Sequence, residues 1–235
     1  MKQIFLKTRY WIFFIFLFTT AFLKAQDPAT LMKLIQVKLE KINDYQADAN
    51  FKTEISFLKV PDSRVKIYYK KPNKIKIKNE TGISLVPKET MSISLYSLVN
   101  SPYQALDAGK DLIEGTSVRV IKLLPTDENG PLVLATLYID PLRLLILKAK
   151  TTTRESGTNE VSLNYGKFLE WGLPDKIVFS FNTEDFKLPK GVTFDYDDGT
   201  VKKKTDETGK SQRGKIEITY LNYSVNRGLP DSLFK

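Results

Sequence analysis

The sequence of 235 residues contains no cysteine and no histidine. Without cysteine the chain forms no disulfide bond, and it offers no thiol to which a lipid anchor could be attached. Without histidine, Ser-His-Asp and Cys-His catalysis are excluded, as are histidine-based zinc sites. The catalytic chemistry that remains open depends on a pair of carboxylates or on a lysine nucleophile.

Long hydrophobic runs are scarce, and the one at the N-terminus resembles a targeting segment. Three basic residues precede the apolar run 10–23, and Ala25 provides a small residue before Gln26. The run is about 14 residues long, whereas a membrane-spanning helix needs roughly 20. This layout is typical of a signal peptide, so we expect cleavage near Ala25 and a soluble, exported protein of residues 26–235. An uncleaved membrane anchor is the alternative.

The charge of the exported protein differs from that of the full sequence. The net charge of +9 includes four positive charges from the predicted signal peptide, namely Lys2, Lys7, Arg9 and Lys24, and 9 − 4 leaves +5. A mildly basic protein is suited to contact with anionic lipid surfaces. We do not expect an exported chain of this kind to bind nucleic acid.

One amphipathic helix is predicted directly after the signal peptide. Asp27 and Pro28 form an N-cap and first-turn pair, and Asn43 and Asp44 end the helix. An apolar stripe recurs behind the cap at spacings of three and four residues. The stripe consists of Leu31, Leu34, Ile35, Leu39 and Ile42.

Strands follow the helix. Residues 47–58 alternate between apolar and polar side chains, which predicts a long strand with one dry face. Residues 64–71 and 74–78 repeat the pattern after turns at Pro61 and Pro72. Such strands indicate an antiparallel meander with one face in water. We therefore predict a mainly β (α+β) fold in a single domain, residues 26–235, built on a large antiparallel sheet with one apolar face.

The second half of the chain predicts further strands, over 116–124, 132–139, 142–148, 157–165, 177–181 and 215–225. Residues 132–139 and 142–148 are apolar on both faces, so we expect them in mid-sheet, beneath a helix or a ligand. An ordinary core under the N-terminal helix and a lipid-sized groove under a helical lid both fit this pattern.

Residues 88–115 are ambiguous. Met91 and Leu95 fit both a strand and a helix, and Ser101-Pro102 with Gln104 behind it resembles a helix cap. We interpret this region as two short helices that cross the open face of the sheet.

Two other motifs have ordinary interpretations. The acidic segment 195–200 contains Gly199, and we interpret it as a hairpin turn. The basic stretch 64–78, with Tyr68 and Tyr69, is best explained as a solvated outer face whose lysines oppose edge aggregation. Binding of anionic headgroups or of an acidic partner surface is the alternative for this stretch.

The order of the elements resembles that of the LolA-like family of periplasmic outer-membrane lipoprotein carriers. The resemblance extends over nearly all of residues 26–235. Its motifs are DYQADANF (44–51), YYKKPNKIKI (68–77), IKLLP (121–125), LYIDP (137–141), LPDKIVFSF (173–181) and YLNYSVNRGLPDSLF (220–234). The resemblance implies an unclosed β-barrel whose concave apolar face is roofed by helices. It implies a periplasmic location and non-covalent binding of acyl chains, without catalysis, cofactor or metal.

The resemblance implies a groove and a lid, and the candidate residues for them are chosen by the alternation pattern alone. The groove is expected to be lined by Phe51, Ile55, Phe57, Ile67, Tyr69, Ile75 and Ile77. The lid is expected to contribute Leu95, Leu98, Tyr103 and Leu106. Burial of each acyl methylene in such a groove is worth roughly 0.8 kcal/mol.

The expected partners are the acyl chains of lipids or lipoproteins, together with partner proteins of the inner and outer membranes, and the protein is expected to be a monomer. Two other functions stay open at this point. One is a protein-interaction or sensory module of the cell envelope on the same scaffold. The other is a carboxylate-dependent hydrolase, which needs an acidic pair with a raised pKa in a cleft.

Overall fold

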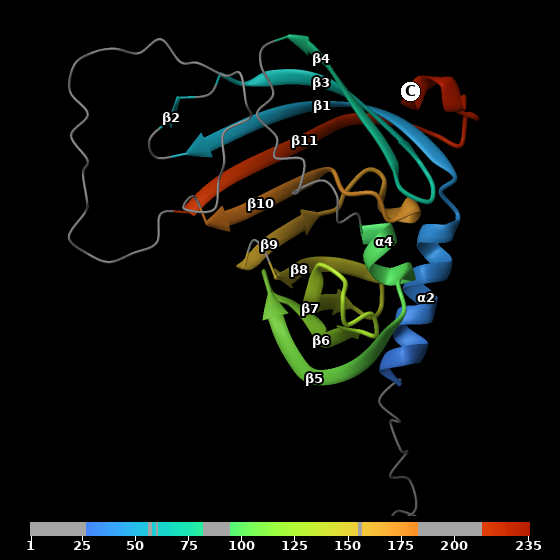
Figure 1. The fold of residues 1–235 in the computed structure, drawn as a ribbon, viewed down its shortest axis with the longest axis vertical. Helices are drawn as coiled ribbons and strands as arrows, with labels where there is room; N and C mark the ends of the chain where they lie inside the picture. Colours follow the sequence, from blue (N-terminus) through green and yellow to red (C-terminus); the bar gives the residue numbers. More distant parts are fainter. Residues whose placement is uncertain (1–26, 56–57, 60, 82–94, 155–156, 183–212) are drawn as a thin grey trace, which may run out of the picture.

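The computed structural model describes residues 27–55, 58–59, 61–81, 95–154, 157–182 and 213–235. Within these residues, 11 strands pair into one antiparallel sheet. The strand order is β4-β3-β1-β11-β10-β9-β8-β7-β6-β5, and β2 pairs with β1 beside this path. The sheet curves, but β4 and β5 stand at its opposite ends, so it is not closed (Figure 1). The predicted fold class is confirmed.

The strands are β1 (Asp44–Ile55), β2 (Leu58–Lys59), β3 (Ser63–Lys70), β4 (Lys74–Thr81), β5 (Tyr103–Ile113), β6 (Thr116–Pro125), β7 (Leu132–Asp140), β8 (Leu145–Thr153), β9 (Gly157–Asn164), β10 (Lys176–Asn182) and β11 (Arg213–Val225). The helices are α2 (Pro28–Glu40) and α4 (Leu95–Asn100), with short 3-10 turns η1 (Leu169–Trp171) and η3 (Asp231–Phe234). The predicted signal peptide 1–25, Phe57, residues 82–94 and the predicted hairpin 195–200 lie outside the described residues.

Helix α2 begins where the sequence predicts. The Asp27 carboxylate accepts a hydrogen bond from the Thr30 backbone N–H at 3.1 Å, and Pro28 lies in the first turn. This arrangement satisfies one of the backbone donors that a helix start leaves without a partner.

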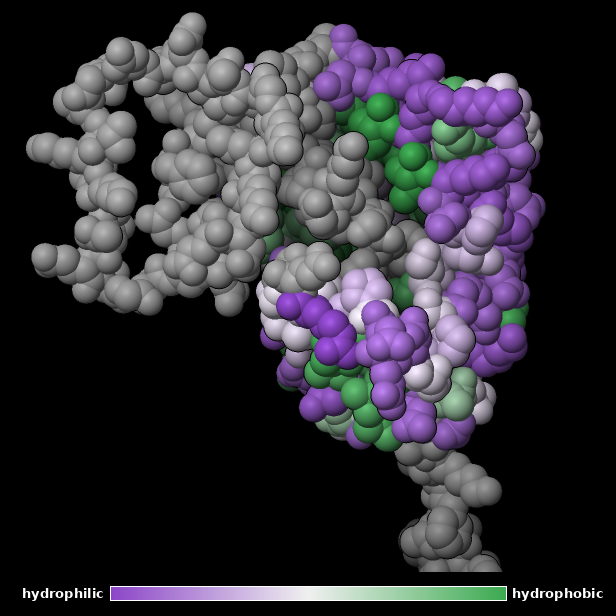
Figure 2. Space-filling model, in the orientation of Figure 1, coloured by the Kyte–Doolittle hydropathy of each residue, from purple (hydrophilic) through white to green (hydrophobic). Residues whose placement is uncertain are grey.

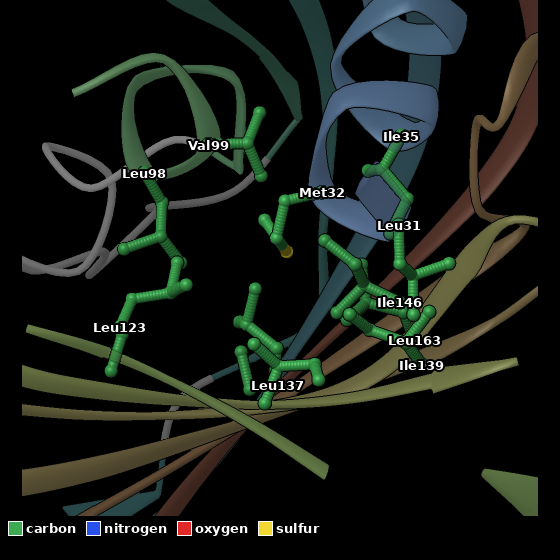
Figure 3. Close-up of a cluster of buried hydrophobic side chains, with 13 residues drawn as sticks. Leu31, Met32, Ile35, Leu98, Val99, Leu123, Leu137, Ile139, Ile146 and Leu163 are labelled. Carbon is green, nitrogen blue, oxygen red and sulfur yellow. The ribbon is translucent and has the colours of Figure 1, made fainter. Parts of the chain in front are cut away.

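The apolar stripe of α2 differs from the prediction at two positions. Leu31 and Ile35 are buried as expected, but Met32 is buried with them, whereas Leu34 is 39% exposed. The buried face is turned toward Met32 because this side chain packs in the same cluster as Leu98 of α4 (Figure 3).

One face of the sheet is apolar across most of its width. Residues directly opposite each other in neighbouring strands point to the same face. One row of such partners runs from β1 to β6. The row consists of Thr53, Ile216, Phe179, Val161, Ala149, Leu137 and Ile121. We call the face that carries this row the inner face.

Two clusters of buried side chains divide the inner face. The helix-covered cluster comprises Leu31, Met32, Ile35, Leu98, Val99, Ile121, Leu123, Ala135, Leu137, Ile139, Ile146, Ala149 and Leu163, from α2, α4 and β6–β9 (Figure 3). The strand cluster comprises Ala49, Phe51, Val65, Ile67, Phe181, Ile216 and Ile218, which lie in or beside β1, β3, β10 and β11. Each large apolar side chain buried in this way is worth about 1.5–3 kcal/mol. The prediction that 132–139 lies mid-sheet beneath a helix is confirmed. For 142–148 the prediction is wrong at its start, because β8 begins at Leu145 and Leu142 is 93% exposed in the preceding turn.

Strand β1 ends earlier than predicted. The alternation suggested one strand through residue 58, but β1 ends at Ile55 and the chain folds back so that Leu58 of β2 pairs with Ile55. A short antiparallel return preserves backbone hydrogen bonding, and alternation alone does not distinguish it from a longer strand.

The prediction of a second lid helix is wrong. Residues 103–113 form strand β5, paired antiparallel with β6, although Ser101-Pro102 resembles a helix cap. Pairing with β6 outweighs the local capping signal, because it satisfies the backbone groups of a whole edge strand. The sheet therefore gains its last strand where a helix was expected.

A buried carboxylate ties the C-terminal segment to the start of β1. Asp44 is only 4% exposed. Its two oxygens accept hydrogen bonds from the backbone N–H groups of Arg227, Gly228 and Leu229 at 2.9–3.3 Å. Hydrogen bonds to a charged acceptor are stronger than neutral ones, so this contact anchors the chain end that follows β11.

We expect Asp44→Ala to lower the free energy of unfolding by about 3 kcal/mol, because three N–H donors lose their acceptor. Urea unfolding of the variant and the parent measures this difference. Glu54→Ala is the control on the same strand. Glu54 pairs with Lys52 at 2.9 Å, but both side chains are more than half exposed, so its removal should change the stability far less than Asp44→Ala does. Equal losses in the two variants would contradict the anchoring role.

Candidate functional site

The candidate site lies in the middle of the inner face, on β9 and β10. Here Val161, Ile177 and Phe179 are only partly buried, whereas the clusters on either side are buried. Ile177 packs against both the helix-covered cluster and the strand cluster. Figure 2 shows hydrophobic side chains among hydrophilic ones on the uncovered parts of this view, above and below the middle of the sheet. The two cores are thus joined by an apolar strip that keeps partial exposure.

The register of β9, β10 and β11 aligns this strip. Ile177 stands opposite Leu163 on one side and Ile218 on the other, and Phe179 stands opposite Val161. Alternating residues of β10 point to the inner face, so its other side chains face outward. The strip is therefore built on hydrogen-bonded strands rather than on loops.

Phe181 continues the strip toward the end of β10. A Cβ atom added to Gly214 would lie 2.4 Å from Cζ of Phe181, so the ring rests directly on the backbone of β11. Only glycine leaves room for this contact.

Tyrosines supply the polar groups of the inner face. Tyr45 stacks on Tyr69 with ring centroids 5.1 Å apart and meets Tyr223 edge-on at 5.3 Å, and Tyr220 stacks on Tyr223 at 4.8 Å. We call these four residues the tyrosine cluster. The Tyr223 hydroxyl donates a hydrogen bond to the Pro174 carbonyl at 2.8 Å. Tyr45 and Tyr220 also pack against the strand cluster, so the tyrosine cluster borders the apolar surface.

Burial raises the pKa of every member of the tyrosine cluster. The pKa of Tyr220 is raised to about 12, mainly by desolvation. Desolvation is also the largest cause for Tyr45, Tyr69 and Tyr223, whose pKa values lie well above the usual range. Tyrosine is protonated at neutral pH in any environment of this kind, and the raised pKa values keep these hydroxyls protonated further into the alkaline range.

One ion pair lies on the same face near the sheet edge. Arg119 is 7% exposed, stands opposite Ile139 of the helix-covered cluster, and pairs with Asp107 of β5. The Gly109 backbone N–H, followed by the Arg119 guanidinium, holds the pKa of Asp107 below its usual value. The charges thus neutralise each other at the end of the apolar row.

The predicted groove residues divide between the clusters. Phe51 and Ile67 are each 2% exposed within the strand cluster, and Ile77 packs against it. Tyr69 is buried and Ile75 partly buried in a third cluster, with Ile42 and Leu173. Ile55 lies in β1, but its side chain, like Phe57, falls outside the described residues.

The predicted lid residues lie in two different elements, α4 and β5. Leu98 of α4 is 4% exposed in the helix-covered cluster, and Leu95 begins the same helix, although its side chain is not among those described. Tyr103 and Leu106 are on strand β5 and not on a helix. Tyr103 packs against the helix-covered cluster, whereas Leu106 is 48% exposed, because alternate residues of a strand face opposite sides.

Sequence reasoning missed the residues at the centre of the site. Val161, Ile177 and Phe179 alternate in their strands, and this signal predicted the strands without showing that they lie between two cores. The tyrosine cluster was missed because Tyr45 and Tyr223 are far apart in sequence. A bulge in the β1–β11 register, between Asp48 and Ala49, also interrupts the simple alternation.

The outer face carries ion pairs rather than apolar rows. Lys66 lies within 3.7 Å of Asp48 and 3.1 Å of Glu80, and Lys176 within 2.7 Å of Glu217. These contacts agree with the prediction that the basic stretch 64–78 is a solvated outer face.

A cavity of about 630 Å³ lies away from the inner-face strip, at the β6–β7 hairpin. Its lining includes Asp127, Glu128 and Arg154, and it is mainly polar. The Arg154 guanidinium donates hydrogen bonds to the Gly130 and Glu128 carbonyls, so it holds the hairpin together. The polar lining does not suit an acyl chain, and the apolar strip remains the better candidate.

The described carboxyl groups can be compared with what a metal site or a carboxylate hydrolase would need. Among the described residues no acidic cluster is arranged to hold a metal ion. The described carboxyls with a shifted pKa, such as Asp107, Asp140 and Glu217, have it lowered. A carboxylate hydrolase needs the opposite shift on one member of its pair. In the described part of the chain, no helix is long and apolar enough to cross a membrane.

No protein-family model matches the chain, and no curated protein matches it by sequence. Solved structures do match it over most of its length. A domain from Vibrio parahaemolyticus, described as an outer membrane lipoprotein-sorting protein domain, has a TM-score of 0.57 at 10% identity, over 88% of this chain and 97% of that chain. A LolA superfamily protein from Nitrosomonas europaea has a TM-score of 0.54 at 12% identity, over 87% and 97%.

A DUF1329 family protein from Desulfovibrio piger has a TM-score of 0.52 at 12% identity, over 89% of this chain and 98% of that chain. At such low identities the likeness establishes the fold alone. This fold is also the one that the order of sequence motifs indicated. The chain has the fold of the LolA superfamily.

Proposed function

We propose that this protein binds the acyl chains of lipids or lipoproteins non-covalently on the inner face of its sheet and carries them through the periplasm toward the outer membrane. The observation that carries the proposal is the apolar row that crosses the sheet from β1 to β6 without interruption by a charged residue. The likeness to a domain described as lipoprotein-sorting supports the same conclusion.

The physical argument rests on apolar contact. Neighbouring strands are about 4.8 Å apart, so the partly exposed part of the row, Val161 and Phe179 on β9 and β10, can contact a segment of an acyl chain, whereas the rest of the row is already buried. Each methylene moved from water gains roughly 0.8 kcal/mol, so binding needs few specific contacts. The ligand can then be passed on without breaking a covalent bond.

The tyrosine cluster fits the polar end of such a ligand. Binding sites for apolar molecules place a few polar groups among hydrophobic walls to orient the ligand. The rings of Tyr45 and Tyr220 pack against the strand cluster, and their hydroxyls, which hydrogen-bond to each other, would exchange that bond for one to an ester or amide carbonyl. The apolar strip would supply affinity, and the tyrosines would set the orientation.

The first experiment is native mass spectrometry of residues 26–235 purified from the periplasm. An added mass that matches a phospholipid or an acylated peptide supports the proposal. A bare chain mass that stays unchanged after incubation with lipids contradicts it, because the inner face would then be an ordinary core.

Phe179→Gln should weaken the binding of a fluorescent fatty acid at least about tenfold, because a large apolar contact is replaced by an amide. Phe179 is a better position than the fully buried Ile67, where a polar group would unfold the protein. A fluorescence titration measures the affinity, and circular dichroism verifies the fold.

Val178→Gln is the matched control, since Val178 is the preceding residue of β10 and stands opposite Glu217, on the outer face. Its affinity for the fatty acid should equal that of the parent. Equal weakening by both substitutions would show that the effect comes from the strand and not from the inner face.

The tyrosine cluster predicts a loss of stability at alkaline pH. The folded pKa of Tyr220 is raised to about 12 from an ordinary value of 10.0, so its contribution is complete below pH 10 and is lost as the pH rises through this window. Urea unfolding at about pH 8 and about pH 11 measures the change. Tyr220→Phe should flatten this dependence, and an unaltered slope in that variant would exclude Tyr220 as a source.

A further inference from the structure

The Lys38 side chain brings three separate segments together at the C-terminal half of α2. Its Nζ donates a hydrogen bond of 2.8 Å to the Arg143 carbonyl in the β7–β8 turn. A Cβ atom on Gly172, after η1, would lie 3.5 Å from Cε of Lys38 and 3.7 Å from Leu39. The outer side of α2, the β7–β8 turn and η1 therefore form one continuous surface.

Each of these segments exposes an apolar side chain next to its contact with Lys38. Leu142 precedes Arg143 and is 93% exposed, Trp171 precedes Gly172 and is 37% exposed, and Val37 precedes Lys38 and is 46% exposed. Leu142 is almost fully exposed in its turn, so its side chain adds almost no buried apolar surface to the fold. We call Val37, Leu142 and Trp171, with Lys38, Lys41 and Arg143, the α2 patch.

Positive charge surrounds these apolar side chains. Lys38, Lys41 and Arg143 belong to the patch, and Lys33 lies one turn earlier on the helix. Burial, and after it the charge of Lys41, lower the pKa of Lys38, and Arg143 adds to this effect while Asp140 opposes it.

Acidic groups offset only part of this charge. Asp140 is buried and accepts hydrogen bonds from Arg143, so this pair is neutral. Glu40 on α2 and Glu170 in η1 are the exposed acidic residues of the described segments that form the patch. When Lys33 beside the patch is counted with Lys38 and Lys41, the lysines outnumber these two glutamates by one, which leaves one excess positive charge.

We propose that the α2 patch docks on the surface of an anionic lipid bilayer. Basic residues attract the headgroups, while a protruding leucine and an interfacial tryptophan enter the boundary between headgroups and acyl chains. A protein partner would bury these side chains in a fitted interface, but the projecting Leu142 and the flanking cations suit a fluid anionic surface better. The proposal does not depend on ligand binding to the inner face.

Docking in this orientation would place α2 between the bilayer and the inner face. Leu31, Met32 and Ile35, on the opposite side of the helix, belong to the helix-covered cluster, and α2 extends along one side of the molecule (Figure 1). The helix in contact with lipid would thus be the helix that covers one half of the apolar row.

Vesicle binding by residues 26–235 tests the proposal. All described helices and strands lie in this range, and Trp171 is its only tryptophan because Trp11 belongs to the predicted signal peptide. We expect co-sedimentation with vesicles of phosphatidylglycerol and phosphatidylethanolamine, with a blue shift of Trp171 fluorescence. We expect little binding to phosphatidylcholine vesicles, and loss of binding at high salt, which screens surface charges.

Leu142→Asp should weaken binding to the anionic vesicles at least about tenfold, and Lys41→Gln about fivefold. Leu112→Asp is the matched control, because Leu112 is 68% exposed on β5, outside the patch. This variant should bind like the parent. Thermal unfolding verifies that all three variants fold.

Three results would overturn the proposal. They are the absence of sedimentation and fluorescence shift with anionic vesicles, equal binding to zwitterionic and anionic vesicles, and equal weakening by Leu142→Asp and Leu112→Asp. Binding to vesicles with an unoccupied inner face would leave this inference intact and contradict only the proposed function, so the two can fail separately.

Discussion

The structure depends on keeping an apolar sheet face away from water although the sheet is not closed. A closed barrel would bury such a face within itself, but here β4 and β5 stand at opposite ends of the strand order. Helices α2 and α4 cover the end near β6–β9, and side chains of β1, β3, β10 and β11 form a second core. Between these cores the row remains apolar and partly exposed at Phe179. An acyl chain is one way to cover the strip, which links the stability of the fold to its proposed function.

Polar groups in this interior have specific partners. The Asp44 carboxylate holds three backbone N–H groups of the C-terminal segment, and Arg119 pairs with Asp107 at the end of the apolar row. Tyrosine hydroxyls remain protonated because burial disfavours their charged form. Because these polar groups are few and have partners, most of this face stays apolar.

Much of the architecture could be predicted from local signals. The Asp27-Pro28 cap predicted the start of α2, and period-two alternation predicted β3 and β4 within a few residues. The prediction failed where a local signal competed with strand pairing. Ser101-Pro102 resembles a helix cap, yet the chain continues into β5, because an edge strand paired with β6 satisfies more backbone groups than a short isolated helix would. The prediction also placed Leu34 in the core, whereas the structure places Met32 there. The position of α4 decides which side of α2 is covered.

The sequence by itself determined that the fold is mainly β with one apolar face, and it excluded histidine and cysteine chemistry, because alternation, capping and composition act over a few residues. Only the tertiary structure decided which strands are neighbours. Tyr45 and Tyr223 meet because β1 pairs with β11, and Lys38 of α2 meets both Arg143 of the β7–β8 turn and Gly172 after η1. Contacts between residues so far apart along the chain leave no local pattern, and they are set by the pairing and packing of the whole sheet.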